Sequence, residues 1–185
     1  GINIFILLAF FCLAIILLTY LIIYVPKFDY IQGRILSFFD RETGTHNFQS
    51  DKAIDSITSG GFFGKGIGEG ILKNRVPEAH TDYIISVISE EFGVVAIMLI
   101  LLLFLIFIYM VFQKISFETD DKIKLILIGS ISLILMQATI HIGVNIRLFP
   151  TTGMTLPFLS YGGSSIISTS ILAGIILNLT KRKIN

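Results

Sequence analysis

The residues best suited to acid–base chemistry lie together in one short stretch, Glu78-Ala79-His80-Thr81-Asp82. A carboxylate or an imidazole can move a proton when a substrate is held beside it. Thr81 is a suitable N-cap, which would put Asp82 in the first turn of a following helix, where the helix dipole favours an anion. Capping alone would also explain this carboxylate. A structural and a catalytic role for Asp82 therefore both stay open from the residues alone.

Two further carboxylates, Glu90 and Glu91, stand just before a long uncharged run. At helical spacing, Asp82, Ser86, Glu90 and Gly93 fall on one face, with Asp82 about 12 Å further along the axis than Glu90. Carboxylates at a membrane boundary need water or a partner. The glutamates are thus expected to be functional or to pair with Arg or Lys from a neighbouring helix.

A glycine-rich run, Gly60–Gly70, precedes this stretch and brings Lys65, Lys73 and Arg75 close in sequence. It lacks the Gly-Lys-Ser/Thr of a P-loop, and its alternating glycines do not fit G-x-G-x-x-G, so nucleotide binding is not expected. Backbone N–H groups of such a run can bind an anion beside these cations. The simpler interpretation is a flexible loop whose glycines serve turns.

Polar residues also recur within the apolar part of the chain. Gln137, His141 and Asn145 follow one another every four residues and predict a polar stripe that faces the bundle interior or a cavity. Interhelical hydrogen bonding would explain the stripe equally well. No second His or Cys stands at ligand spacing on that face, so a zinc site is not expected. Near the end of the chain three serines align at helical spacing among glycines, which is typical of close helix packing: Ser160, Ser164 and Ser168.

The elements that must position these residues are membrane helices. Hydrophobic residues make up 54% of the 185 residues and charged residues only 15%, whereas soluble domains carry about 25% charged residues. Four apolar runs each reach the ~20 residues that cross a bilayer core. The sequence predicts an all-α, polytopic membrane bundle with a single membrane domain over 1–185. We expect spans at about 2–25, 83–112, 123–147 and 157–180, with a long external loop at about 26–81.

The first apolar run, the single cysteine and the net charge argue against three other interpretations: a signal peptide, a cysteine-based site and a nucleic-acid-binding protein. The first run has no basic n-region, so it is not a signal peptide, and the start at Gly1 suggests a truncated product. Cys12 inside that run is expected to serve packing. The net charge is +1 and the basic residues form no stripe, so no nucleic-acid partner is expected.

The long loop is expected to carry two short amphipathic helices on the membrane surface, at Ile31–Phe39 and Phe48–Ile57. Two spans separate this loop from the turn at Pro150, so both are expected to lie on the same side of the membrane. The short loop with Lys114, Lys122 and Lys124 shares the other side with the basic C-terminal tail. By the positive-inside bias of short segments, the C-terminus is expected to be cytoplasmic.

Three segments, in order, resemble signatures of the SEDS (shape, elongation, division and sporulation) family of peptidoglycan polymerases. They are Ile57–Gly66, Val76–Ile84 with the following Glu90–Gly93, and Phe149–Ser165. The Gly-Met-Thr-Leu-Pro-Phe sequence within the third segment resembles the cell-division branch of the family more than the elongation branch. The resemblance covers essentially the whole chain but only the back of the family's ten-span pattern, so these spans would be the seventh to the tenth.

The resemblance implies polymerisation of lipid II at the outer face of the bacterial cytoplasmic membrane for septal wall synthesis. It implies a class B penicillin-binding protein and other divisome membrane proteins as partners. On the family's pattern Asp82 would be the catalytic base, and Glu78, His80, Ser160 and Ser164 would shape the substrate pocket. His141 stands where relatives commonly carry Asn, and Arg147 where a small or uncharged residue is usual.

We add a hypothesis of our own for the leaving group. Lys65, Lys73 and Arg75 would neutralise the departing pyrophosphate, with a divalent cation (Mg²⁺ or Mn²⁺) near Asp82 but no metal ligands assigned. Two other functions stay open: a non-catalytic scaffold that activates the penicillin-binding protein, and a lipid II flippase. A transporter often shows inverted repeats, and these four spans show none. Without the first six spans this chain is expected to be inactive alone.

Overall fold

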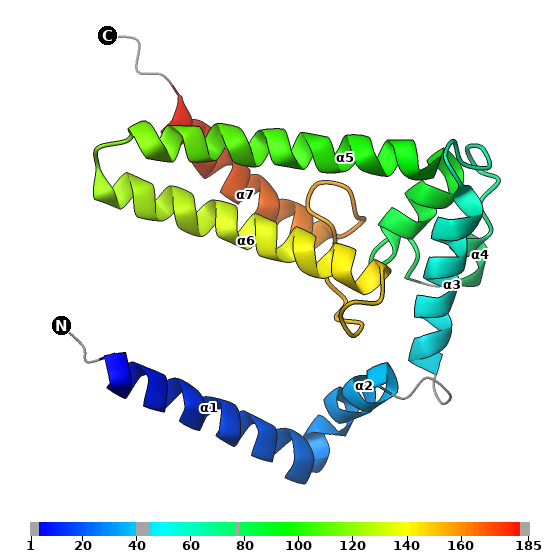
Figure 1. The fold of residues 1–185 in the computed structure, drawn as a ribbon, viewed down its shortest axis with the longest axis horizontal. Helices are drawn as coiled ribbons and strands as arrows, with labels where there is room; N and C mark the ends of the chain where they lie inside the picture. Colours follow the sequence, from blue (N-terminus) through cyan, green and yellow to red (C-terminus); the bar gives the residue numbers. More distant parts are fainter. Residues whose placement is uncertain (1–3, 40–44, 77, 182–185) are drawn as a thin grey trace. The chain divides into compact units, whose positions relative to one another are not determined.

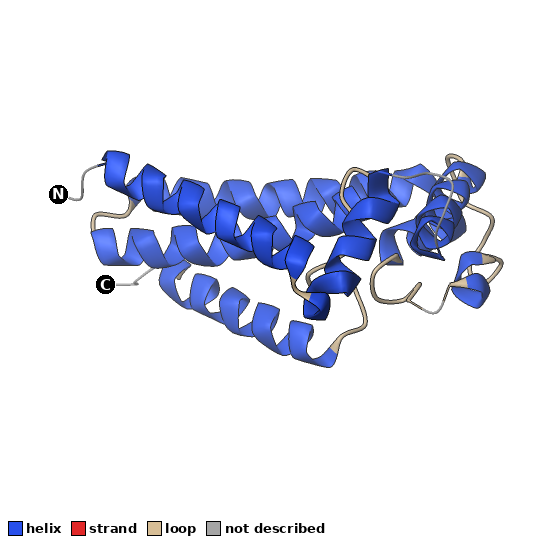
Figure 2. Cartoon of the chain, turned by 90° about the horizontal axis from the view of Figure 1, so that it is seen from below, coloured by secondary structure: helices blue, strands red, loops and turns tan. Residues whose placement is uncertain are grey.

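The structure, a computed structural model, describes residues 4–39, 45–76 and 78–181, and this part of the chain is helical without a strand (Figures 1 and 2). Four helices are long and apolar enough to cross a membrane, which confirms the predicted all-α membrane fold. The elements are α1 (Ile4–Tyr24), the 3₁₀ helix η1 (Pro26–Phe28), α2 (Asp29–Phe39), α3 (Thr45–Gly60), α4 (Leu72–Arg75), α5 (Ile84–Phe117), α6 (Asp121–Asn145) and α7 (Gly163–Thr180).

The chain divides into two compact units, Gly1–Asn47 and Phe48–Asn185. In the first unit, α1 is apolar throughout and none of its residues is buried. Pro26 begins η1, where its fixed φ angle suits a helical start. The helix α2 that follows includes the first of the two predicted amphipathic segments, and Arg34 stacks on the Tyr30 ring within it.

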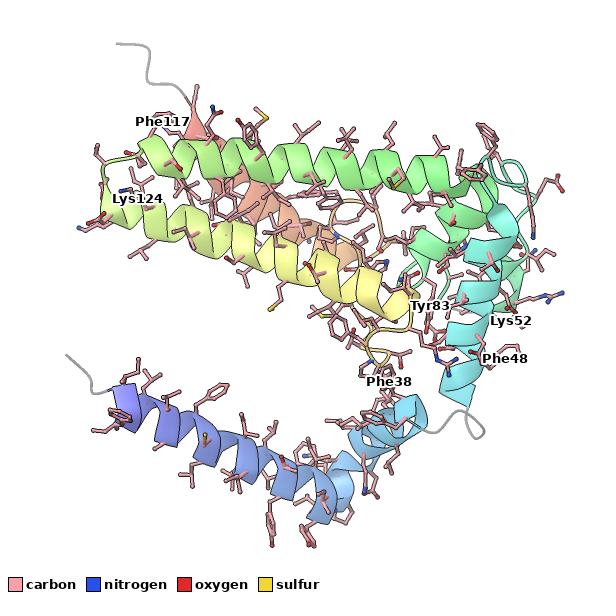
Figure 3. All side chains as sticks on the ribbon, in the orientation of Figure 1. Phe38, Phe48, Lys52, Tyr83, Phe117 and Lys124 are labelled. Carbon is pink, nitrogen blue, oxygen red and sulfur yellow. The ribbon has the colours of Figure 1, made fainter. Side chains whose placement is uncertain are left out.

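The second unit is built on α5, α6 and α7 (Figure 1). A cluster of large aliphatic side chains fills the space between these helices: Val111, Leu127, Ile131, Ile134 and Ile176. Phe117 and Lys124, labelled in Figure 3, mark the end at which α5 turns into α6. The start of α5 and the end of α6 therefore meet at the opposite end, where Tyr83 lies beside α3.

The final span begins later than its apolar run suggests. We expected it from 157, but α7 starts at Gly163, and residues 157–160 form a turn and a bend instead. Ser160 Oγ accepts a hydrogen bond from the Leu156 backbone N–H (2.8 Å), which closes a turn ahead of the helix. The predicted alignment of Ser160 with Ser164 and Ser168 on one helix face is consequently wrong.

The helix α5 is broken at Gly93, whose φ of 79° and ψ of −178° are not helical. The glycine-rich run lies against this break and supplies the backbone hydrogen bonds that the break removes. The bonds run from Lys65 N to Glu90 O (2.9 Å), Gly66 N to Glu91 O (3.1 Å), Val94 N to Gly61 O (2.9 Å) and Val95 N to Phe62 O (3.3 Å).

This backbone-to-backbone contact explains why glycines are needed on both sides. A Cβ atom at Gly60 would lie 2.0 Å from Ser89 O, and one at Gly93 would lie 2.2 Å from Phe62 O. The amides of Lys65 and Gly66 already donate within the protein, so they do not form the anion cradle that we considered. The run is instead a fixed structural complement to the broken helix.

Candidate active site

Asp82 lies in a series of turns just before α5, not in its first turn. The helix begins at Ile84 with Tyr83 as N-cap, and no side chain caps it, so the N-cap role expected for Thr81 is wrong. The cause is Glu78, whose carbonyl accepts hydrogen bonds from Asp82 N (2.9 Å) and from Thr81 Oγ1 (3.1 Å). The chain is closed into a tight turn here, and this turn delays the helix.

The backbone at Asp82 is held from two other parts of the chain. The three successive carbonyls of residues 80–82 each accept a hydrogen bond, from Tyr161 N (3.0 Å), Ser160 Oγ (2.7 Å) and Asn145 Nδ2 (2.9 Å) respectively. Two of the donors come from the loop before α7 and one from the end of α6. Because these bonds join segments far apart in sequence, they fix the position from which the Asp82 side chain projects.

The carboxylate of Asp82 is half-buried and faces Gly153. A Cβ atom on Gly153 would lie 3.7 Å from Asp82 Oδ2, and the φ of this glycine is +74°. Such a φ angle strains any residue with a side chain. The glycine therefore lets the loop before α7 turn directly beside the carboxylate.

Asn145 connects this site to the helices. Its side chain is fully buried, and Oδ1 accepts from Ser86 Oγ (2.7 Å) and Ser86 N (3.2 Å). Its Nδ2 donates to the carbonyls of Asp82 and His141, each at 2.9 Å. One amide thus joins α6, α5 and the turn that carries Asp82.

The rest of the predicted polar stripe also faces inward. Gln137 Nε2 donates to Thr155 O (2.9 Å) and to Ser165 Oγ (3.0 Å), and His141 Nδ1 lies 2.8 Å from Met154 O. The stripe binds the loop before α7 as well as neighbouring helices. Its role is to seat that loop, which in turn holds the backbone at Asp82.

Glu90 has a structural partner that the sequence did not identify. Its side chain is 3% exposed and pairs with Lys65 Nζ at 3.0 Å. The other oxygen accepts from the backbone N–H groups of Ile71 and Leu72, each at 3.0 Å. We expected a cation from a neighbouring helix, whereas the cation comes from the glycine-rich run. The alternating glycines beside Lys65 could have indicated this partner, because they allow the backbone of the run to approach another segment closely.

Two of the three cationic residues predicted to neutralise the pyrophosphate, Lys65 and Arg75, line a cavity that Asp82 does not line. Lys65 and Arg75 line a cavity of about 180 Å³ together with Lys52 and Glu90, and Asp82 is not among its lining residues in the described part of the chain. Lys73 belongs to α4, but its side chain lies outside the described part. The structure therefore brings two of the three cations together without bringing them to the carboxylate.

The remaining predicted site residues are more peripheral. Glu78 is exposed and accepts a hydrogen bond from Gln49 Nε2 (3.0 Å), and His80 is exposed beside it in sequence. Ser164 is exposed in the first turn of α7, and only its carbonyl has a described partner, Ser168 Oγ. Of the predicted serines, Ser160 alone is tied to the turn at Asp82.

The metal expected near Asp82 has no evident protein ligand set. Within the described ranges, no three His, Cys, Asp or Glu side chains lie close enough together to hold an ion. Gly153 lies beside the carboxylate, and Asn145 donates to the backbone carbonyl of Asp82.

Comparisons with known proteins identify the family of the chain. The FtsW/RodA/SpoVE family, described as "Cell cycle protein", matches residues 1–185. A relative from Enterococcus hirae named "Probable peptidoglycan glycosyltransferase FtsW" is 34% identical over 181 residues, which cover 92% of this chain and 46% of the relative. Proteins of the same name from Caulobacter vibrioides and Francisella salina are 37% identical (84% of this chain, 40% of theirs) and 39% identical (89% and 42%).

A solved structure shares the fold. It is described as "Structural coordination of polymerization and crosslinking by a peptidoglycan synthase complex", with a TM-score of 0.71 and 26% identity. The match covers 97% of this chain and 50% of that one. The chain thus spans about half the length, or less, of the relatives that it matches.

Proposed function

Because the chain belongs to the FtsW/RodA/SpoVE family of cell cycle proteins, we propose that it is part of a peptidoglycan glycosyltransferase. The whole enzyme would polymerise lipid II into glycan strands for the septal wall, at the outer face of the bacterial cytoplasmic membrane. The four span-capable helices make this a multi-pass membrane protein. Relatives named as FtsW glycosyltransferases support the assignment to the division branch.

The observation that carries the proposal is the fixing of Asp82. A general base must be held within hydrogen-bond reach of the proton that it takes. Here a half-buried carboxylate projects from a turn whose three carbonyls are all bonded to distant segments. Gly153, which has no side chain, lies beside this carboxylate.

The proposed step is a single displacement. Asp82 accepts the proton of the acceptor sugar hydroxyl while that oxygen bonds to the anomeric carbon of the donor. The bond from this carbon to the polyprenyl pyrophosphate breaks, and the pyrophosphate leaves with the electron pair. Attack opposite the leaving group would invert the anomeric configuration.

The developing charge on the pyrophosphate calls for nearby cations. We propose Lys65, Lys73 and Arg75 for this role. Lys65 also pairs with Glu90, and Lys65 and Arg75 line a cavity that Asp82 does not line. Glu78, His80, Ser160 and Ser164 would shape the site. Replacing each of the three cations by Ala should weaken substrate use, and normal polymerisation by all three variants would refute this assignment.

A class B penicillin-binding protein is the proposed partner, because polymerised glycan must next be crosslinked. The related solved structure is described as coordinating polymerisation with crosslinking in one complex, which supports a pairing of this kind. Other divisome membrane proteins are proposed as further partners, and the C-terminus is proposed to be cytoplasmic.

The test uses the full-length parent with its partner in liposomes, supplied with labelled lipid II. Wild type should give a ladder of glycan chains, and Asp82→Asn should abolish it. A matched control is Asp121→Asn, because that carboxylate is 91% exposed at the start of α6, the end of this helix away from Asn145. Equal ladders from both variants would remove Asp82 from catalysis. Complex formation and lipid movement between leaflets, measured in parallel, separate the scaffold and flippase alternatives.

A further inference from the structure

The tip of the glycine-rich run carries large apolar side chains that the described part of this chain leaves exposed. Phe62, Phe63 and Ile67 are 75%, 85% and 80% exposed. Soluble surfaces rarely expose such a group together, so a contiguous apolar tip indicates an interaction. The tip is also firmly positioned, because the backbone around it is bonded to α5 on both sides of Gly93.

Those backbone bonds set the depth of the tip. Gly61 and Phe62 pair with Val94 and Val95, the first residues of α5 after its break. From Val94 to Phe117 the helix is about 36 Å long, slightly more than the hydrocarbon core of about 30 Å. The first turn after the break therefore lies at the boundary between acyl chains and headgroups, and the tip lies beside it.

The surroundings of the tip suit a lipid surface. The exposed apolar surface continues from the tip onto α5 through Phe92 (44% exposed) and Val95 (50% exposed). Arg75 lines the neighbouring cavity and has no ion-pair partner among the described residues. Aromatic and aliphatic side chains at the acyl boundary with cations on the water side form the usual pattern of an interfacial anchor.

We propose that the Gly61–Ile67 tip is a membrane anchor that inserts into the leaflet at the N-terminal end of α5. The tip would insert its apolar side chains among the lipid headgroups and upper acyl chains. It would thereby hold the glycine-rich run and α4 against the broken helix α5. This inference needs only that α5 spans a bilayer, so it stands or falls separately from the proposed glycosyltransferase activity.

Site-directed spin labelling of the full-length parent in nanodiscs tests the proposal. Single cysteines replace Phe63 and Ile67 on a background without other reactive cysteines, Cys12→Ser included, and each carries a nitroxide. Glu69→Cys is the matched control, because Glu69 is exposed in the same loop but polar. Collision with oxygen, which prefers lipid, is compared with collision with a water-soluble nickel chelate, and spin-labelled lipids give the depth scale.

We expect the oxygen-to-nickel ratio to be severalfold higher at Phe63 and Ile67 than at Glu69. The depth of both labels should fall between the phosphate and the upper acyl carbons. Ratios equal to that of Glu69 would place the tip in water and overturn the proposal. Shielding from both reagents would overturn it too, because the tip would then be covered by protein. An unchanged thermal midpoint of each labelled variant confirms that the fold is intact.

Discussion

Asn145 uses both ends of its amide to hold the backbone around Asp82. Replacing it by Ala leaves Ser86 Oγ and the Asp82 carbonyl without these partners, and each unsatisfied buried group costs about 1–3 kcal/mol. We expect Asn145→Ala to lower the thermal midpoint and to reduce kcat for glycan polymerisation strongly. Asn178→Ala, at an exposed position on α7, is the control and should change neither. A variant at Asn145 with full activity would show that Asp82 does not depend on this bond.

The ion pair between Glu90 and Lys65 is expected to stabilise the fold. In Glu90→Gln the amide oxygen can still accept from the Ile71 and Leu72 amides, but Lys65 loses its counter-charge. We expect a lower thermal midpoint in Glu90→Gln and a smaller additional loss when Lys65→Met is introduced as well. Contacting residues typically show interaction energies of about 0.5–3 kcal/mol in such a cycle. Additive effects of the two substitutions would contradict a direct stabilising pair.

At this scale the sequence could predict residue types but not partners. The four-residue spacing of Gln137, His141 and Asn145 correctly predicted that the stripe faces inward. It did not reveal that the loop before α7 is the main partner of Gln137 and His141. Likewise, Glu90 needed a cation, but only the folded chain shows that Lys65 supplies it. Pairings over long sequence separations depend on tertiary geometry, which local spacing does not contain.

At the scale of elements, Gly93 at the break in α5 is constrained both by its backbone conformation and by a close neighbour. Its φ is +79°, and an added Cβ would lie 2.2 Å from Phe62 O. We expect Gly93→Ala to lower the thermal midpoint markedly and to expose the glycine-rich run to protease. Gly129→Ala in α6 is the matched control, because nothing lies within 4 Å of its added Cβ. That substitution should be neutral or stabilise the protein by about 0.5–1 kcal/mol.

The apolar runs predicted the spanning helices well because length and hydropathy alone decide whether a helix can cross a bilayer. The ends were less predictable. Hydropathy does not distinguish the residues of 157–162 from α7, and it does not show that the helix is broken at Gly93. Both features depend on backbone hydrogen bonds to distant segments. The two short helices expected in the loop are present, within α2 and α3.

At the scale of the whole molecule, the chain covers less than half of its FtsW relatives. The described part nevertheless contains a self-consistent site: the turn at Asp82, the loop that holds it and the stripe that seats that loop lie in one compact unit. The remainder of the relatives' length would be needed to enclose a lipid-linked substrate. Activity is therefore expected only from the full-length parent.

The orientation of this unit in the membrane decides whether the proposed reaction takes place outside the cell. Asn74 on α4 and Thr119 between α5 and α6 are both exposed and lie at opposite ends of α5. We expect a membrane-impermeant maleimide to label Asn74→Cys in intact spheroplasts, on a background that includes Cys12→Ser. Thr119→Cys should react only after permeabilisation.

The reverse pattern would place Asp82 and the tip at Gly61–Ile67 on the cytoplasmic side. Polymerisation at the outer face would then be impossible at this carboxylate, whatever its geometry. Labelling of both positions in intact cells would indicate damaged membranes, which a cytoplasmic marker protein with an exposed cysteine detects. The expected pattern would instead put the turn at Asp82 and the proposed lipid anchor on the side where the wall is built.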